Sequence, residues 1–370
     1  MSREAIFEAS LDYFLGPVRE YLRDGSVTEI MINSFDKIYV ERQGRLEKTD
    51  ATFPSEDSLL SAVRNVAQYV GREIDADRPI LDARLPDGSR VHAVIPPSAR
   101  LGTYVTIRKF KRDILGMDDF VRLRSMSDAS KEFLEICVRL RKNILIAGGT
   151  GTGKTTLLNA VSTAIPDEER IVVIEDNSEL NLAQSHCLYL ESQQADAYGH
   201  GGVNIRQLFI ASLRMRPDRI IVGEVRSGEA LDMVQSMISG HSGSLTTVHA
   251  TSPRDAMVRL ETLSLMSDVD IPIYVARAQV ASAIHLIVQL SRFSEDGSRK
   301  ITRITEAYGL DENNRYQFQD IFVSRLKGRT ASGDLIAELG LVGNNPTFHR
   351  EAYEFGMDDQ IHLTSELWKR

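Results

Sequence analysis

Apolar residues recur at helical spacing near the start of the chain and change to strand-like alternation after it. Residues 1–23 carry apolar side chains three and four positions apart, which predicts a helix packed on a neighbour, with a kink at Pro17. Short alternating runs predict strands at 28–33, 37–42, 90–95 and 104–108, with a helix over 55–70 between them. We therefore expect a helical segment over 1–23 and a compact α/β domain over 24–112.

Short, fully apolar runs alternate with helical stretches in the second half of the chain. Runs at 144–147, 171–174, 219–223 and 245–248 are typical of buried parallel strands with helices on both faces. The turn residues at 295–298 predict a hairpin between 283–290 and 300–307, and the tail is expected to end in a helix. The charged stretch 113–127 is interpreted as a linker, so the second, larger α/β domain spans 128–370.

Composition narrows the class of protein. The chain is 42% hydrophobic and 26% charged, as in a soluble globular protein. No uncharged apolar run approaches the roughly 18 residues of a membrane span, and acids stand where a signal peptide is basic, so we expect a cytoplasmic chain with no transmembrane segment. The net charge of -8 argues against a surface that binds nucleic acid throughout. Cys137 and Cys187 are interpreted as buried thiols rather than a disulfide.

The stretch GGTGTGKTTLLNA, from Gly148 to Ala160, follows an apolar run and fits G-x-x-x-x-G-K-[ST] in full. A strand, a glycine-rich loop and a helix in this order place backbone N–H groups around a polyphosphate at a helix N-terminus. We expect Lys154 to reach the β- and γ-phosphates of ATP and Thr155 to place its hydroxyl on Mg²⁺. The predicted nucleotide-binding residues are Gly148, Gly149, Thr150, Gly151, Thr152, Gly153, Lys154, Thr155 and Thr156. A glycine-rich turn that binds nothing is the alternative.

Two of the apolar strands end in acids. Glu175 and Glu224 are expected at the carboxyl edge of the parallel sheet, beside the phosphate loop, where both contribute to a metal site. We assign Glu224 as the general base, because its segment has the form of a Walker B element. For Glu175 the alternative is an exposed strand end. Arg214 and Arg216 precede the Walker B strand and either meet a neighbouring subunit's nucleotide or lie on a solvated helix face.

Histidines bracket the last apolar strand of this group. His249 ends the strand among small and hydroxyl residues, where we expect it to sense a γ-phosphate, and His241 is expected to orient the segment. A lone histidine is usually a satisfied polar residue, so His92 and His285 are assigned no role.

Four segments, GGTGTGKT, VIEDNSEL, RMRPDRIIVGEVR and GHSGSLTTVHA, resemble in this order the Walker A, Asp box, Walker B and His box of the secretion ATPases, which power type II and type IV secretion and pilus assembly. The text ARLPDGSRVHAVIPP, followed by TIRKF, resembles the tight-adherence (Tad/Flp) pilus assembly ATPases, the CpaF branch. The likeness extends from about Val27 to the end of the chain. Two distant cysteines exclude the tetracysteine zinc module of some extension motors.

This resemblance implies a RecA-like P-loop NTPase C-terminal domain with a smaller α/β N-terminal domain. Subunits would form a homo-hexamer with ATP between the two domains. Family roles map onto Glu175 for the Asp box, Glu224 for the catalytic carboxylate, His249 for the His box and Arg214 for the arginine that completes a neighbour's site. Arginines of the N-terminal domain also contact nucleotide in this family; the candidates are Arg90, Arg100, Arg108 and Arg112, and Arg108 is assigned to the nucleotide site.

The function that the resemblance implies is ATP hydrolysis driving pilus assembly or type II/IV secretion through an inner-membrane platform. The chain would be cytoplasmic and held at the membrane by its partners, with a hinge over 113–119 that turns hydrolysis into domain motion. Direct contact with nucleic acid is not expected. Two alternatives stay open: a nucleic-acid translocase, for which the segment 199–206 offers only one arginine, and a regulatory switch that binds ATP without useful turnover.

Overall fold

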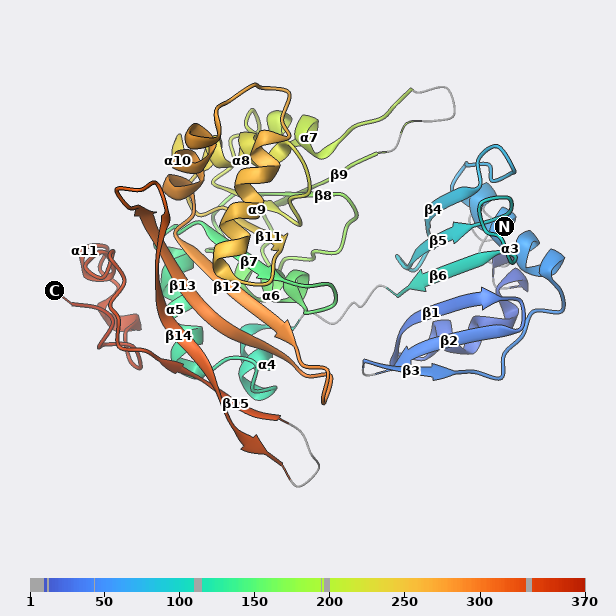
Figure 1. Cartoon of the computed structure of the whole chain (residues 1–370), viewed down its shortest axis with the longest axis horizontal. Helices are drawn as coiled ribbons and strands as arrows, with labels where there is room; N and C mark the ends of the chain where they lie inside the picture. The colour runs from blue at the N-terminus through green and yellow to red at the C-terminus, as the bar shows by residue number, and fades with distance from the viewer. Residues whose placement is uncertain are drawn as a thin grey trace. The chain divides into compact units, whose positions relative to one another are not determined.

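The computed structural model divides into two compact units, residues 1–113 and 114–370. It describes residues 10–369 apart from 12, 43, 110–114, 194, 196–199 and 331–334. Figure 1 shows the helices and strands of both units. Arg112, one of the arginines expected at the nucleotide, and the first nine residues of the predicted N-terminal helix lie outside the described residues.

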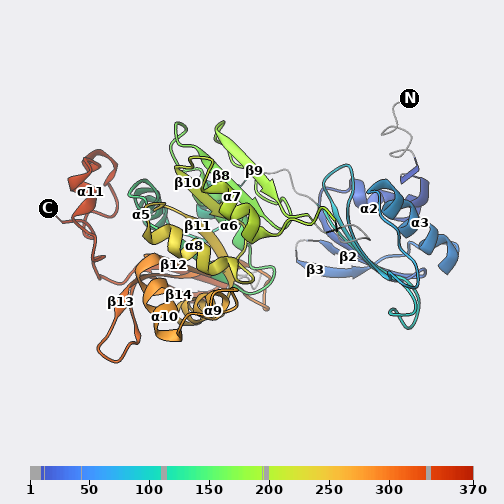
Figure 2. The ribbon, with the colours of Figure 1, turned by 90° about the horizontal axis from the view of Figure 1, so that it is seen from above.

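The first unit is an antiparallel sheet with helices on one face. Its six described strands follow the order β3-β2-β1-β6-β5-β4. They span Val27–Ser34 (β1), Lys37–Arg42 (β2), Arg45–Lys48 (β3), Ile80–Arg84 (β4), Arg90–Val94 (β5) and Tyr104–Arg108 (β6). The helices are a 3-10 turn at Gly16–Val18 (η1), Arg19–Arg23 (α2) and Glu56–Tyr69 (α3). Figure 2 shows α2 and α3 together on one side of this sheet, where their apolar residues bury the inner faces of β1 and β2.

Sequence periodicity predicted most of this unit. The Ser55 side chain accepts a hydrogen bond from the Ser58 backbone N–H, which is the N-cap expected at the start of α3. The pattern missed β3 and β4. All four residues of β3 are exposed, and β4 buries Leu81 alone, so neither strand carries the alternation by which a half-buried strand is recognised.

The second unit is a mixed sheet of nine described strands in the order β15-β14-β13-β12-β7-β11-β10-β8-β9. Six neighbouring strands, β12-β7-β11-β10-β8-β9, run parallel, as the apolar runs predicted. Strands β13, β14 and β15 extend the sheet in antiparallel fashion. They span Ile144–Gly148 (β7), Ile171–Glu175 (β8), Cys187–Glu191 (β9), Arg219–Val222 (β10), Leu245–His249 (β11), Leu286–Arg292 (β12), Arg299–Leu310 (β13), Tyr316–Arg329 (β14) and Leu335–Leu341 (β15). The predicted hairpin is confirmed as β12 and β13.

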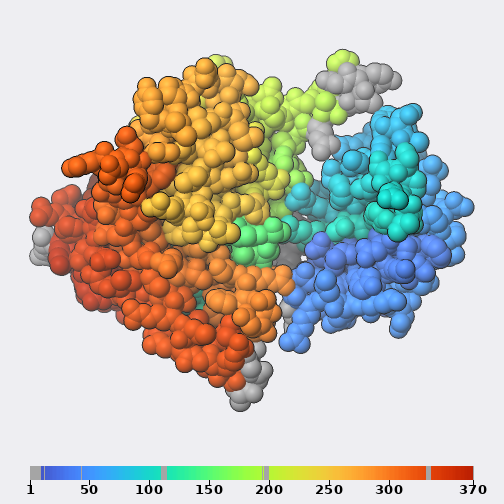
Figure 3. All heavy atoms as spheres, viewed as in Figure 1, coloured from blue at the N-terminus to red at the C-terminus, as the bar shows by residue number. Residues whose placement is uncertain are grey.

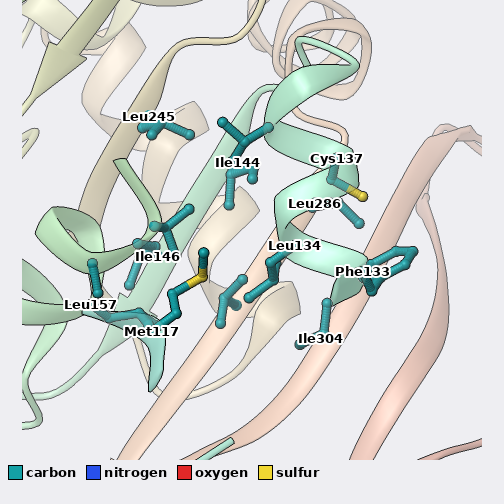
Figure 4. Close-up of a cluster of buried hydrophobic side chains, with 14 of the residues drawn as sticks. Met117, Phe133, Leu134, Cys137, Ile144, Ile146, Leu157, Leu245, Leu286 and Ile304 are labelled. Atoms are coloured by element: carbon teal, nitrogen blue, oxygen red, sulfur yellow. The ribbon is translucent and has the colours of Figure 1, made fainter. Parts of the chain in front are cut away.

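Helices cover both faces of this sheet, because successive strand residues point to opposite sides. Ile144 and Ile146 of β7 join the cluster beneath α4, α5 and α6, whereas Leu145 and Ala147 join the cluster beneath α7, α8, α9 and α10. Figure 4 shows the first cluster, with β7 facing α5. These helices span Met117–Arg122 (α4), Asp128–Arg139 (α5), Lys154–Ser162 (α6), Ile205–Ser212 (α7), Glu229–Ile238 (α8), Pro253–Leu265 (α9) and Ile273–Ala283 (α10). The result is a three-layer α/β/α unit.

Two stretches differ from their predictions. The stretch 113–127, interpreted as a linker, contains α4, because Met117 and Phe120 are buried in the core beside α6. The tail holds only short helices, Glu351–Glu354 (α11) and the 3-10 turn Asp358–Gln360 (η2), in place of a terminal helix. Its last part is held instead by the buried Glu132 carboxylate, which accepts hydrogen bonds from the backbone of residues 363 and 364.

No helix in the described part of the chain is both long and apolar enough to cross a membrane. The thiols of Cys137 and Cys187 are free, the first fully buried and the second partly, so the expectation that no disulfide joins them is confirmed.

Candidate active site

The phosphate loop, residues 149–153, joins β7 to α6 at the middle of the sheet, between β11 and β12. Gly151 and Gly153 have φ angles of +69° and +92°, a left-handed region that glycine enters at little cost. Gly148 is needed for another reason: a Cβ atom there would lie 2.5 Å from Oγ1 of Thr152 and 3.0 Å from the carbonyl oxygen of Leu290. Glycine is therefore required at 151 and 153 for the left-handed backbone and at 148 because a side chain would clash.

Lys154 begins α6 and is only 8% exposed, which is unusual for a lysine. Its Nζ donates a hydrogen bond of 3.0 Å to the Gly149 carbonyl and lies 3.4 Å from Nδ1 of His249. The ammonium therefore sits over the loop, at the N-terminus of the helix, where the helix dipole favours an anion. Thr155 is partly buried in the first turn of α6, whereas Thr150 and Thr156 are exposed. In Figure 3 the green atoms of this region reach the surface of the second unit.

His249 and Glu224 meet at the carboxyl edge of the sheet, because β10 and β11 are neighbouring parallel strands. Nε2 of His249 lies 2.7 Å from Oε1 of Glu224, at ion-pair distance. Oε1 is buried, and apart from this contact no described residue donates a hydrogen bond to it. Partial burial and the charge of Lys154 lower the pKa of His249, against the opposing effect of Glu224. The net shift favours the neutral form of the imidazole.

Arg226 holds the other oxygen of Glu224, a contact that the sequence analysis did not foresee. Its Nε and Nη2 donate hydrogen bonds of 2.8 and 2.6 Å to Oε2 of Glu224, and its Nη1 donates one of 3.2 Å to Asp176. Asp176 in turn accepts a bond of 2.6 Å from the Ser192 hydroxyl. The sequence could have indicated this contact, because Arg226 lies only two positions after Glu224 in the Walker B segment. Its guanidinium orients Glu224 and ties the ends of β10 and β8 together.

Glu175 ends β8 and is 4% exposed. Burial raises its pKa to about 7, against the backbone N–H groups of Glu179 and Leu180, which donate to Oε1 at 2.8 and 3.0 Å. Its side chain lies against Gly223, where an added Cβ would be 3.0 Å from Cγ of Glu175. The structure therefore places this acid beside the strand end that carries Glu224, buried rather than exposed.

Two arginines from the β12–β13 hairpin approach the phosphate loop, and no local pattern predicted either. Nε of Arg299 donates a hydrogen bond of 2.7 Å to the Gly151 carbonyl. Nη1 of Arg292 would lie 3.6 Å from a Cβ atom at Gly151, so both guanidinium groups lie along the loop. They come from a part of the chain remote in sequence, and only the pairing of β12 with β7 brings them here.

The other arginines predicted at the nucleotide belong to both units. Arg214 and Arg216 follow α7 and are exposed, and Arg216 has a φ of +52°. Arg108 ends β6 in the first unit, opposite Arg90 in the strand register. Arg100 is also exposed in that unit. The roles expected of these five arginines stay predictions.

His285, His92 and His241 make contacts of a structural kind. Nδ1 of His285 accepts a bond of 3.0 Å from the Asn143 backbone N–H, and burial lowers its pKa to about 4. Nδ1 of His92 lies 2.7 Å from Asp82 on the exposed face of the first unit. The backbone carbonyl of His241 accepts a bond from the Ser244 hydroxyl, which holds the turn leading into β11.

The residues at this edge fit a nucleotide with Mg²⁺. The cradle at Gly148 admits no side chain, two glycines turn the loop, and Lys154 supplies a buried cation at a helix N-terminus. Thr155 supplies a hydroxyl for a cation that keeps several waters and binds substrate phosphates. The Glu224 carboxylate lies at the same edge, with its buried Oε1 2.7 Å from Nε2 of His249.

Comparisons with known proteins agree with this arrangement. The family model for Type II/IV secretion system proteins matches residues 14–334. The chain is 35% identical over 319 residues to the type IV secretion system protein PtlH of Bordetella pertussis, covering 79% of this chain and 94% of that protein. It is 33% identical over 326 residues to the type IV secretion system protein VirB11 of Bartonella quintana, covering 78% of this chain and 91% of that protein.

A solved structure shows the same fold. The X-ray structure of the Legionella pneumophila ATPase DotB aligns with a TM-score of 0.55 at 19% identity, covering 83% of this chain and 82% of that one. The architecture is that of the two-domain RecA-like ATPases. With the family model matching most of its length, this chain belongs to the Type II/IV secretion system protein family.

Proposed function

We propose that this chain is an ATPase that hydrolyses ATP to ADP and phosphate to drive a pilus-assembly or secretion apparatus. The meeting of Lys154, His249 and Glu224 carries the proposal: the lysine and the imidazole are 3.4 Å apart, and the imidazole and the carboxylate 2.7 Å. A phosphate loop alone accounts for binding. A buried carboxylate beside it adds the base that hydrolysis needs.

Glu224 acts as general base in this mechanism. A water beside the carboxylate attacks the γ-phosphorus; the new P–O bond forms as the bond to the β–γ bridging oxygen breaks, and the proton passes to Glu224. Arg226 keeps the carboxylate aimed by holding Oε2. Lys154 exchanges its bond to the Gly149 carbonyl for β- and γ-phosphate oxygens and offsets their charge. His249 contacts the γ-phosphate and, because its Nε2 lies 2.7 Å from Glu224, connects the bound phosphate to the base.

When bound, Mg²⁺ would neutralise part of the negative charge on the phosphate oxygens. Thr155 would hold it directly through its hydroxyl, and Glu175 and Glu224 are the carboxylates at the same sheet edge. Because burial raises the pKa of Glu175 to about 7, a nearby cation would favour its charged form.

Membership of the family supports a proposal for the wider assembly. We place the chain in a homo-hexamer, in the cytoplasm and attached to inner-membrane platform proteins, with Arg214 completing a neighbouring site and Arg108 contacting the nucleotide from the first domain. The segment ARLPDGSRVHAVIPP supports the tight-adherence pilus branch. Binding of ATP would favour closure of the two domains, and loss of γ-phosphate contacts would release it.

Replacing Glu224 by Gln tests the proposal. Gln keeps the shape but cannot accept the proton, so we expect phosphate release to fall at least a hundredfold, while a nonhydrolysable ATP analogue still binds. Glu312→Gln is the control, because Glu312 is exposed in the turn after β13. Equal rates for Glu224→Gln and the control would remove Glu224 as base. Undetectable turnover in the wild-type protein with Mg²⁺ would favour the regulatory switch.

The structure weakens the nucleic-acid translocase. Arg206, the single arginine of the segment 199–206, forms ion pairs with Asp232 at 2.7 Å and Asp268 at 2.5 Å. Its charge is therefore matched within the protein, and contact with a phosphate backbone would require breaking both pairs. Strong stimulation of ATP turnover by single-stranded DNA, lost at high salt, would reverse this preference.

A further inference from the structure

Arg299 contacts the phosphate loop with its side chain and a different segment with its backbone. On one side its Nε donates to the Gly151 carbonyl at 2.7 Å, and its Cδ would lie 3.5 Å from a Cβ atom at Gly153. The side chain thus lies flat along the two loop residues whose backbones are left-handed. Holding the Gly151 carbonyl toward the guanidinium favours a loop whose N–H groups face inward, as an anion requires.

The backbone around Arg299 is tied to residues 124 and 125. The Ser125 hydroxyl donates a bond of 2.5 Å to the Arg299 carbonyl, and the Ile301 N–H donates one of 3.0 Å to the Ser125 carbonyl. A third bond, 3.2 Å, runs from Nζ of Lys300 to the Arg124 carbonyl. Ser125 and Lys300 are both buried, so these bonds are shielded from water.

The described part of the second unit begins at residue 115, shortly after the division at residue 113, and residues 117–126 belong to this first part. They comprise α4 and the turn in which the N–H groups of Ser125 and Met126 both donate to the Phe120 carbonyl. Met117 of α4 packs beside Leu157 of α6, the helix that begins with Lys154. The segment 117–126 therefore packs against α6 and, through Arg299, is connected to the phosphate loop.

We infer that Arg299 is a positioning residue that couples occupancy of the phosphate loop to the segment 117–126, and so to the connection between the two domains. The inference rests on the proposed function, because it takes a nucleoside triphosphate as the ligand of the loop. A phosphate that draws in the loop N–H groups moves the Gly151 carbonyl. Arg299 donates to the Gly151 carbonyl and accepts from the Ser125 hydroxyl, so these two bonds transmit the movement to the segment 117–126.

Arg299→Gln and Ser125→Ala break this link from its two sides. We expect Arg299→Gln to raise the KM for ATP about tenfold with kcat within about threefold of wild type, because it weakens phosphate binding without touching the base. Arg299→Lys, which can still reach the Gly151 carbonyl, should restore most of the KM. Arg303→Gln is the matched control: it lies on the same strand, but its guanidinium pairs with Asp320.

The decisive measurement is amide hydrogen exchange of residues 117–126 with and without a nonhydrolysable ATP analogue. Wild type and Arg303→Gln should show added protection on binding, and both Arg299→Gln and Ser125→Ala should lose it at saturating analogue. A wild-type response in both variants would overturn the inference. This readout needs no turnover, so it fails or succeeds separately from the assignment of hydrolysis, which the phosphate-release assay tests.

Discussion

Gly243 precedes β11 in the His-box segment and lies against the side chain of Arg219. A Cβ atom at this position would be 1.9 Å from Nη1 and 2.7 Å from Cζ of Arg219, and the φ angle of +87° disfavours any side chain. Arg219 is 1% exposed and pairs with Glu169 through Nε at 2.5 Å. Its Nη2 also donates to the Val138 carbonyl at 2.9 Å. Gly243→Ala therefore forces the buried Arg219 guanidinium away from its ion pair and hydrogen bond.

The cost of Gly243→Ala follows from two contributions. A left-handed backbone costs a residue with a side chain about 1–2 kcal/mol. Displacing Arg219 disrupts a buried charge pair, which typically costs about 3–5 kcal/mol when one partner is left uncompensated. We expect a loss of about 4 kcal/mol or more in the free energy of unfolding, a large part of the about 5–15 kcal/mol that stabilises a domain. With a urea slope near 3 kcal/mol per M, the midpoint falls by more than about 1 M.

The fluorescence of Trp368 allows the unfolding of the second unit to be measured separately. This residue is the single tryptophan of the chain, is 1% exposed and stacks on Phe133 of α5, the helix whose Val138 carbonyl accepts from Arg219. Urea unfolding followed by its fluorescence therefore reports the unfolding of the second unit. Gly340→Ala is the control, because no atom lies within 4 Å of a Cβ there. A midpoint for Gly243→Ala equal to that of the control would refute the reasoning.

Two further predictions concern acid stability and the base. His285 is held neutral by burial with a pKa of about 4, below its ordinary 6.5, so stability is lost as the pH falls from about 6.5 to 4, by up to about 3 kcal/mol. His285→Asn keeps an acceptor for the Asn143 N–H, so its urea midpoint, followed from pH 7 to 4.5, should decline less than that of wild type. Arg226→Gln releases Oε2 of Glu224, so kcat for phosphate release should fall about ten- to hundredfold with KM within about threefold. An unchanged kcat would mean that Arg226 does not orient the base.

Much of the candidate site was predictable because it depends on one rule of parallel sheets. Apolar runs ending in Glu175, Glu224 and His249 had to deliver these residues to the same edge as the phosphate loop. The structure brings His249 and Glu224 to within 2.7 Å and His249 to within 3.4 Å of Lys154. The rule could not say that Glu175 would be buried with a pKa near 7, because burial depends on how the residues after β8 fold back over it.

By itself the sequence determined the phosphate loop, the buried parallel strands and the edge at which acids and imidazole gather, because each follows from neighbouring residues and the period of side chains along a strand. Only the tertiary structure decided that Arg299 holds the Gly151 carbonyl and that α4 belongs to the core. Contacts between residues far apart in the chain leave no local pattern. They arise because β12 pairs beside β7 and carries the hairpin with it, so their geometry exists only once the sheet is assembled.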